Sequence, residues 1–113
     1  MRKVPEWFRE FAEGNPQITE AYENLAAECR KFGPLSEKEQ LLVKLGVATG
    51  SHTEGSVRSQ VRKALDAGVK PAEIRHAIVL ALAPIGFPRM MAALDWAEDV
   101  LKAKIPENKK RRS

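Results

Sequence analysis

The sequence predicts an all-helical protein. Three observations lead to this prediction. Apolar residues recur at three- and four-residue steps, and glycine and proline separate the stretches in which they do so. No stretch keeps the two-residue alternation of a strand, and no Asn-Gly or Asp-Gly pair marks a hairpin. We therefore expect an all-α domain of about six helices joined by short connections.

The first two helices are expected on either side of Gly14. Pro5 can begin a short helix that ends near Gly14, and Asn15 then offers an N-cap with Pro16 in the first helical position. The second helix carries one apolar stripe, made of Ile18, Tyr22, Leu25, Cys29 and Phe32. The steps of four and three residues in this stripe indicate an amphipathic helix, which Gly33 closes.

Two capping boxes are expected in the middle of the chain. Ser36 followed three residues later by Glu39 is the pattern in which a serine side chain and a glutamate side chain each accept a backbone N–H. We expect it to begin a helix that ends at Gly50. Residues 51–54, Ser-His-Thr-Glu, repeat the pattern and predict the start of the next helix, which stops at Gly68.

Proline marks the last two helices. Pro71 begins one that runs through Leu82, the prolines within residues 84–88 break it, and Pro88 begins a final helix that Pro106 ends. The helix that begins at Pro71 is apolar all round near its end, as is the helix that begins at Ser36. A chain of 113 residues cannot easily cover both, so we expect burial between subunits of a homo-oligomer.

The charge pattern separates the body of the chain from its end. The formal net charge is +4, and residues 109–112 carry four positive charges, which leaves 4 − 4 = 0 for the rest. We expect a single helical domain over residues 1–106 and a basic, solvated tail over residues 107–113. A neutral body does not predict nucleic-acid binding, although weak binding through the tail remains an alternative.

Composition also limits location and redox chemistry. No apolar run of signal-peptide length follows Met1, and the longest apolar stretch, residues 77–85, is too short to cross a membrane. We therefore expect a cytoplasmic protein without membrane contact. Cys29 is the only cysteine, so the chain has no intramolecular disulfide. Its place on an apolar stripe predicts an inert core thiol.

Several segments between Leu35 and Leu101 resemble the carboxymuconolactone decarboxylase and alkylhydroperoxidase D-like family. They are Leu-Ser-Glu-Lys-Glu at residues 35–39, Val-Arg-Lys-Ala-Leu-Asp-Ala-Gly at 61–68, the helix start at 71–74, and Gly-Phe-Pro at 86–88 followed by Met-Ala-Ala-Leu at 91–94. The resemblance implies an all-helical fold that assembles as dimers, trimers or hexamers. The family includes lactone decarboxylases and thiol-dependent peroxidases.

The family's peroxidases use a Cys-x-x-Cys pair, a histidine four residues after the second cysteine, and a glutamate on the preceding helix. The resemblance places Thr53 and Ser56 at the cysteine positions, Gln60 at the histidine position and Leu41 at the glutamate position. Two hydroxyls cannot form a disulfide, and a glutamine amide cannot shuttle protons near neutral pH. The dithiol peroxidase mechanism is therefore excluded. Lactone decarboxylases need no cysteines, although they often keep a histidine where Gln60 stands.

We expect a small-molecule-binding or lyase-like protein with its site at the start of the helix that follows Gly50. Thr53, Ser56 and Gln60 have the spacing of one helix face, with Phe87 on the apolar side of the pocket. His52, at the expected helix start, is the one plausible catalytic base. The opposing interpretation has Thr53 and Ser56 as capping residues, Gln60 facing solvent and His52 in an exposed loop.

Other interpretations remain open. One is a non-catalytic oligomeric scaffold, and another is a thiol peroxidase that works through the lone Cys29. Arg58 and Arg62, four residues apart, could face an anionic ligand, but a solvated helix face is the simpler interpretation. His52 and His76 are isolated from any cysteine or carboxylate cluster, so we expect no metal site and no cofactor. His76 itself is expected to be solvated.

Overall fold

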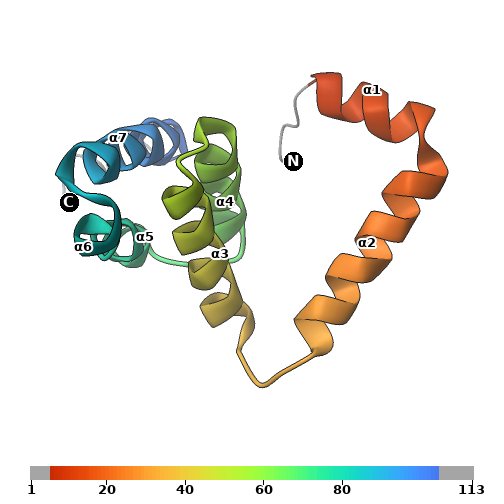
Figure 1. The fold of residues 1–113 in the computed structure, drawn as a ribbon, viewed down its shortest axis with the longest axis horizontal. Coiled ribbons are helices and arrows are strands. Elements are labelled where there is room, and N and C mark those ends of the chain that lie inside the picture. Colours follow the sequence, from red (N-terminus) through yellow and green to blue (C-terminus); the bar gives the residue numbers. More distant parts are fainter. Residues whose placement is uncertain (1–5, 105–113) are drawn as a thin grey trace. The chain divides into compact units, whose positions relative to one another are not determined.

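The structure, a computed structural model, describes residues 6–104, and these residues are almost entirely helical (Figure 1). The elements are α1 (Glu6–Gly14), α2 (Pro16–Lys31), α3 (Glu37–Ser51), α4 (Glu54–Asp66), α5 (Pro71–Val79), α6 (Leu82–Ile85) and α7 (Phe87–Lys104). The described part of the chain contains no strand, so the predicted all-α class is confirmed. The expected roles of Pro5 and Pro106 and the basic tail at 107–113 fall outside the described residues.

Two compact units make up the chain, one within residues 1–35 and the other within residues 36–113. The first holds α1 and α2. Asn15 precedes α2 as expected, but its side chain does not cap that helix. Its amide instead donates a hydrogen bond to the carbonyl of Phe11, at 3.0 Å, and so satisfies an end of α1. The single domain expected over residues 1–106 stays a prediction.

The apolar stripe of α2 is exposed along its length. No residue of this helix is buried, and the side chains of Ile18, Tyr22 and Leu25 are 59%, 66% and 64% exposed. Phe32, which follows the helix, is 93% exposed. Cys29 is exposed as well, so the prediction of a core thiol was wrong for the single chain. The stripe predicted the helix correctly.

The second unit has one hydrophobic core. In this unit α3 packs on α4, and α4 and α5 both pack on α7. The core consists of Leu45, Ala48, Val57, Val61, Ala64, Val69, Ile74, Ile78, Met90, Ala93, Ala97, Val100 and Leu101. The buried residues of α4 recur at steps of four and three, which is the period that places them on one helix face.

One of the two expected capping boxes is present. The backbone N–H of Glu39 donates to Ser36 Oγ at 3.1 Å, and the N–H of Ser36 donates to Glu39 Oε1 at 2.9 Å. The box predicted at residues 51–54 was wrong. Ser51 is the last residue of α3, and its hydroxyl donates back to the carbonyl of Val47 at 2.7 Å. Because Ser51 is still inside α3, the N-cap position of α4 falls to Thr53, two residues later.

The break before α7 lies earlier than expected. α5 ends at Val79, and α6 then forms a separate short helix. Pro84 lies in the first turn of α6, where its missing N–H costs nothing. Gly86, with φ of 93°, turns the chain into α7. Pro84 therefore does not end α5. It lies near the start of a new helix, and α5 has already ended five residues before it.

Ion pairs connect α5 to helices on either side. The carboxylate of Glu98 on α7 accepts two hydrogen bonds from Arg75, at 2.6 and 3.2 Å. These hydrogen bonds raise the pKa of the Arg75 guanidinium. Lys38, in the first turn of α3, pairs with Glu73 of α5. The two pairs thus join α5 to α3 and to α7.

Candidate functional site

The junction between α3 and α4 has an unusual backbone. His52 follows α3 with φ of 57° and ψ of 44°, and it is the one non-glycine residue with a positive φ in the described part of the chain. This left-handed conformation is uncommon for side chains other than Asn, Asp and His. It directs the half-buried imidazole toward α7, where the ring centroid lies 5.1 Å from that of Trp96. We had expected His52 at the start of α4, but it lies at the end of α3.

One nitrogen of this imidazole has no partner. His52 Nδ1 is buried and makes no hydrogen bond to any of the residues that the structure describes. Buried polar atoms are nearly always hydrogen-bonded, so an unpaired one needs an explanation. The interpretation of His52 as an exposed loop histidine does not hold.

Gln60 contains a second buried atom of this kind. It lies on α4 between Val57 and Val61, both fully buried, and its Oε1 is buried without a hydrogen-bond partner in the described chain. The buried hydroxyl of Thr49 gives a contrast, because it donates to the carbonyl of Leu45 at 2.9 Å. Gln60 is half-buried rather than solvent-facing, and its amide oxygen lacks a hydrogen-bond donor among the described residues.

The other expected site residues are exposed. Thr53 is the N-cap residue of α4, but its side chain makes no capping hydrogen bond. Ser56 is exposed on the first turn of α4, and Phe87 is 60% exposed at the start of α7. The structure thus turns His52 and Gln60 inward and leaves Thr53, Ser56 and Phe87 at the surface.

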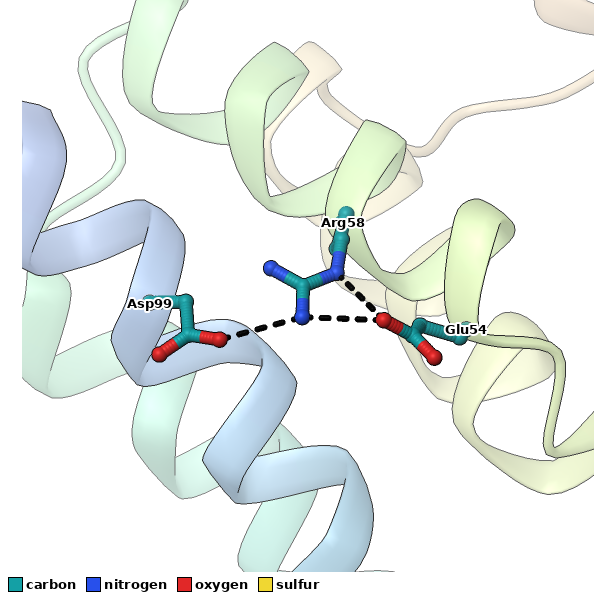
Figure 2. A network of polar contacts seen from close by, with 3 residues as sticks. All are labelled: Glu54, Arg58 and Asp99. Carbon is teal, nitrogen blue, oxygen red and sulfur yellow. Dashed lines mark hydrogen bonds and ion pairs between the residues drawn. The ribbon is translucent and has the colours of Figure 1, made fainter.

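Arg58 pairs with carboxylates on two helices. Its guanidinium donates to Glu54 on α4 at 2.9 Å and to Asp99 on α7 at 3.0 Å, as Figure 2 shows. Its side chain is 27% exposed, and the hydrogen bond to Asp99 is the main cause of a raised pKa. Arg58 is therefore partly exposed, and it joins α4 to α7.

A groove opens elsewhere in this unit, where α3 faces α5 and α6. Its volume is about 570 Å³, within the usual range for ligand-sized hollows. It is lined by Leu42, Val43, Gly46, Gly50, Glu73, His76, Ala77, Leu80, Ala81, Pro84 and Ile85. None of the five residues predicted from the sequence lines this groove. The two helices that we had found apolar all round, α3 and α5, form its walls.

The charged group of this groove is already paired. Glu73 Oε1 accepts the backbone N–H of Lys70 at 3.0 Å, and Oε2 pairs with Lys38. The hydrogen bond from Lys38, followed by that from Lys70, lowers the pKa of Glu73. His76 is exposed, as expected, and lies in the lining of the groove. The groove is therefore mainly an apolar surface with one imidazole.

The described residues contain no group of three or more His, Cys, Asp or Glu side chains that could hold a metal ion. None of their helices has both the length and the apolar character that crossing a membrane requires.

The sequence profile of the carboxymuconolactone decarboxylase family matches residues 16–99, from the start of α2 into α7. The chain belongs to this family. The resemblance drawn from the segments between residues 35 and 101 is thereby confirmed. Searches of curated proteins and of solved structures gave no significant match. Within this family member, Gln60 and His52 are the predicted site residues that the fold turns inward.

Proposed function

We propose that this member of the carboxymuconolactone decarboxylase family binds a small hydroxylated molecule beside Gln60 and His52, and that any reaction there is lyase-like. The observation that carries the proposal is the buried, unpaired Oε1 of Gln60. A buried acceptor without a donor costs about 1–3 kcal/mol. A ligand that supplies an O–H or N–H group at this position would recover part of that cost on binding.

His52 provides the second unpaired group of the proposed site. Its Nδ1 is buried and unpaired, and its ring is held against Trp96. When the proton is on Nε2, Nδ1 is an acceptor, so it too favours a ligand that donates a hydrogen bond. A neutral imidazole in this state can also accept a proton from a ligand hydroxyl, which makes His52 the candidate base.

The polar groups at this site do not favour redox chemistry by a thiol pair. The resemblance to the family places Gln60 where its peroxidases have a histidine, and Thr53 and Ser56 where they have cysteines. These side chains can bind and orient a ligand, but they cannot pass through a disulfide. The proposal therefore lies on the decarboxylase side of the family, with a non-catalytic scaffold as the other outcome.

A thermal-shift screen tests the proposal. The purified protein is heated with small lactones, hydroxy acids and dicarboxylates, each hydroxy acid being paired with the acid that lacks the hydroxyl. A ligand that binds only the folded state raises the melting temperature. We expect a hydroxy acid to raise it and its partner acid to have less effect.

Two variants make the screen specific. Gln60→Met removes the unpaired oxygen at nearly constant volume, and Gln17→Met makes the same change at an exposed position of α2. We expect the ligand to stabilise the wild type and Gln17→Met but not Gln60→Met. Equal stabilisation of all three proteins would refute the site, and a screen without ligands would favour the non-catalytic scaffold.

A further inference from the structure

Two contacts join the α3–α4 junction and α4 to one turn of α7. The imidazole of His52 lies against the indole of Trp96, with ring centroids 5.1 Å apart, and Arg58 donates a hydrogen bond to Asp99 at 3.0 Å. Trp96 and Asp99 are three residues apart on α7, so their side chains are neighbours on the surface of that helix. The ion pair therefore anchors the turn of α7 that carries Trp96.

The His52 ring has an aromatic neighbour but no hydrogen bond at its buried nitrogen. A histidine side chain is commonly oriented by a hydrogen bond at one ring nitrogen, whereas Nδ1 of His52 has none among the described residues. Trp96 is half-buried and packs against the core of the second unit, so the fold holds the indole in place. Contact with the indole is therefore the interaction through which the fold can set the orientation of the imidazole.

Arg58 connects α7 to the first turn of α4 (Figure 2). It donates to Glu54 at 2.9 Å as well as to Asp99, so one guanidinium binds carboxylates from both helices. Hydrogen bonds between ionised groups are stronger than those between neutral groups. Glu54 follows His52 by two residues, and Asp99 follows Trp96 by three. The ion-pair bridge thus lies next to the ring contact at both of its ends.

We propose that Arg58 is a positioning residue for His52. By holding Asp99 it keeps Trp96 against the imidazole, and this contact keeps Nδ1 in the buried position where a ligand can donate to it. The consequence for binding rests on the proposed function, whereas the effect of Arg58 on the ring needs no ligand. Arg58 acts here through its carboxylate partners rather than by contact with the ligand.

α7 carries a second ion pair of the same kind, which provides a matched control. Arg75 on α5 donates to Glu98 at 2.6 and 3.2 Å. Glu98 precedes Asp99 in the sequence, and consecutive residues of a helix do not face each other. Arg75→Met therefore removes an arginine–carboxylate pair from the same turn of α7, but it loosens α7 from α5 and not from α4. Arg58→Met and Arg75→Met both keep the apolar stem of the side chain.

NMR spectra of the ligand-free protein measure the ring contact at about pH 9, where an ordinary imidazole is neutral. The ring current of Trp96 shifts the imidazole signals of His52 away from those of an exposed histidine. The chain has two histidines, so the signals that His76→Asn removes assign both. Trp96→Leu gives the change in the His52 signals that follows loss of the indole.

We expect Arg58→Met to move the His52 signals by at least about half of the change in Trp96→Leu. Arg58→Lys, which keeps the charge, should move them less, and Arg75→Met should leave them in place. Unchanged His52 signals in Arg58→Met overturn the proposal. An equal change in Arg75→Met overturns it too, because a general loosening of α7 would then be the cause.

Titration calorimetry with malate, a small hydroxy acid, relates the ring to binding. We expect Arg58→Met to weaken malate binding at least about fivefold and Arg75→Met to change it less than about twofold. Unchanged binding by Arg58→Met overturns the positioning role in binding, even where the His52 signals have moved. A wild type that does not bind malate counts against the proposed function instead, and the NMR comparison still decides whether Arg58 positions His52.

Discussion

The imidazole of His52 lies against the indole of Trp96, with 5.1 Å between the ring centroids and 42° between the ring planes. This contact joins the α3–α4 junction to α7. His52 follows the last residue of α3 in a left-handed backbone conformation, which is a common way for a helix to end. The backbone conformation and the ring contact together hold the unpaired Nδ1 in its buried position.

Replacing His52 by Asn should abolish ligand binding while the protein stays folded. Asn tolerates the left-handed conformation, but its side chain is too short to reproduce the ring contact and has no imidazole. We expect a loss of about 0.5–1.5 kcal/mol in the free energy of unfolding, measured by urea denaturation. His76→Asn, at an exposed position, is the control. Wild-type ligand binding by His52→Asn would contradict the assigned role.

Replacing Gln60 by Met should stabilise the ligand-free protein. The substitution keeps the volume and removes a buried oxygen that lacks a donor. We expect the free energy of unfolding to rise by about 1 kcal/mol, whereas Gln17→Met should leave it nearly unchanged. A clear loss of stability in Gln60→Met would show that the amide oxygen is satisfied in the folded protein, which the account does not allow.

The Arg58 bridge should contribute modestly and in a salt-dependent way. Arg58→Met removes both contacts, to Glu54 and to Asp99, but keeps the apolar stem. Because both carboxylates are about half exposed, we expect a loss of about 0.5–1 kcal/mol in urea denaturation. The difference from wild type should shrink in 1 M salt. An equal loss at both salt concentrations would indicate that packing, not charge, holds α4 to α7.

Glu73 should make stability depend on acid pH. Its pKa is lowered from the ordinary 4.5 by Lys38 and by the N–H of Lys70, so its ionised form stabilises the folded state. That contribution is present above pH 4.5 and is lost as the pH falls through the lower, folded-state pKa. The stability difference between wild type and Glu73→Gln should therefore be largest near neutral pH and decline below pH 4.5. Asp95→Asn is the control, and a difference that stays constant from pH 7 to 3 would contradict the assignment.

The helices could be predicted because local signals decide them, and the errors arose where one local signal had two possible outcomes. Residues 36–39 and 51–54 both read Ser-x-x-Glu. Ser36 follows an irregular connection and forms the box, whereas Ser51 is still within α3 and bonds to the carbonyl of Val47. The pattern alone does not distinguish a serine that begins a helix from one that ends the previous helix.

The site was harder to predict, because residue spacing fixes a helix face but not its depth. Thr53, Ser56 and Gln60 have the spacing of one face, yet the first two are at the exposed start of α4 and Gln60 is in its packed middle. The groove required knowledge of which helices pack together. Gly46 and Ala77, about 30 residues apart in the chain, line it jointly, and no periodicity along the sequence connects them.

The central claim is that the amide oxygen of Gln60 accepts a hydrogen bond from a ligand hydroxyl. Titration calorimetry tests it most directly, with a hydroxy acid from the screen and the matching acid without the hydroxyl, against wild type and Gln60→Met. The account predicts that losing the hydroxyl weakens binding about tenfold in the wild type and has little effect in Gln60→Met. The reason is that the ligand hydroxyl and the Gln60 amide oxygen are the two partners of one hydrogen bond. An equal loss in both proteins would contradict it.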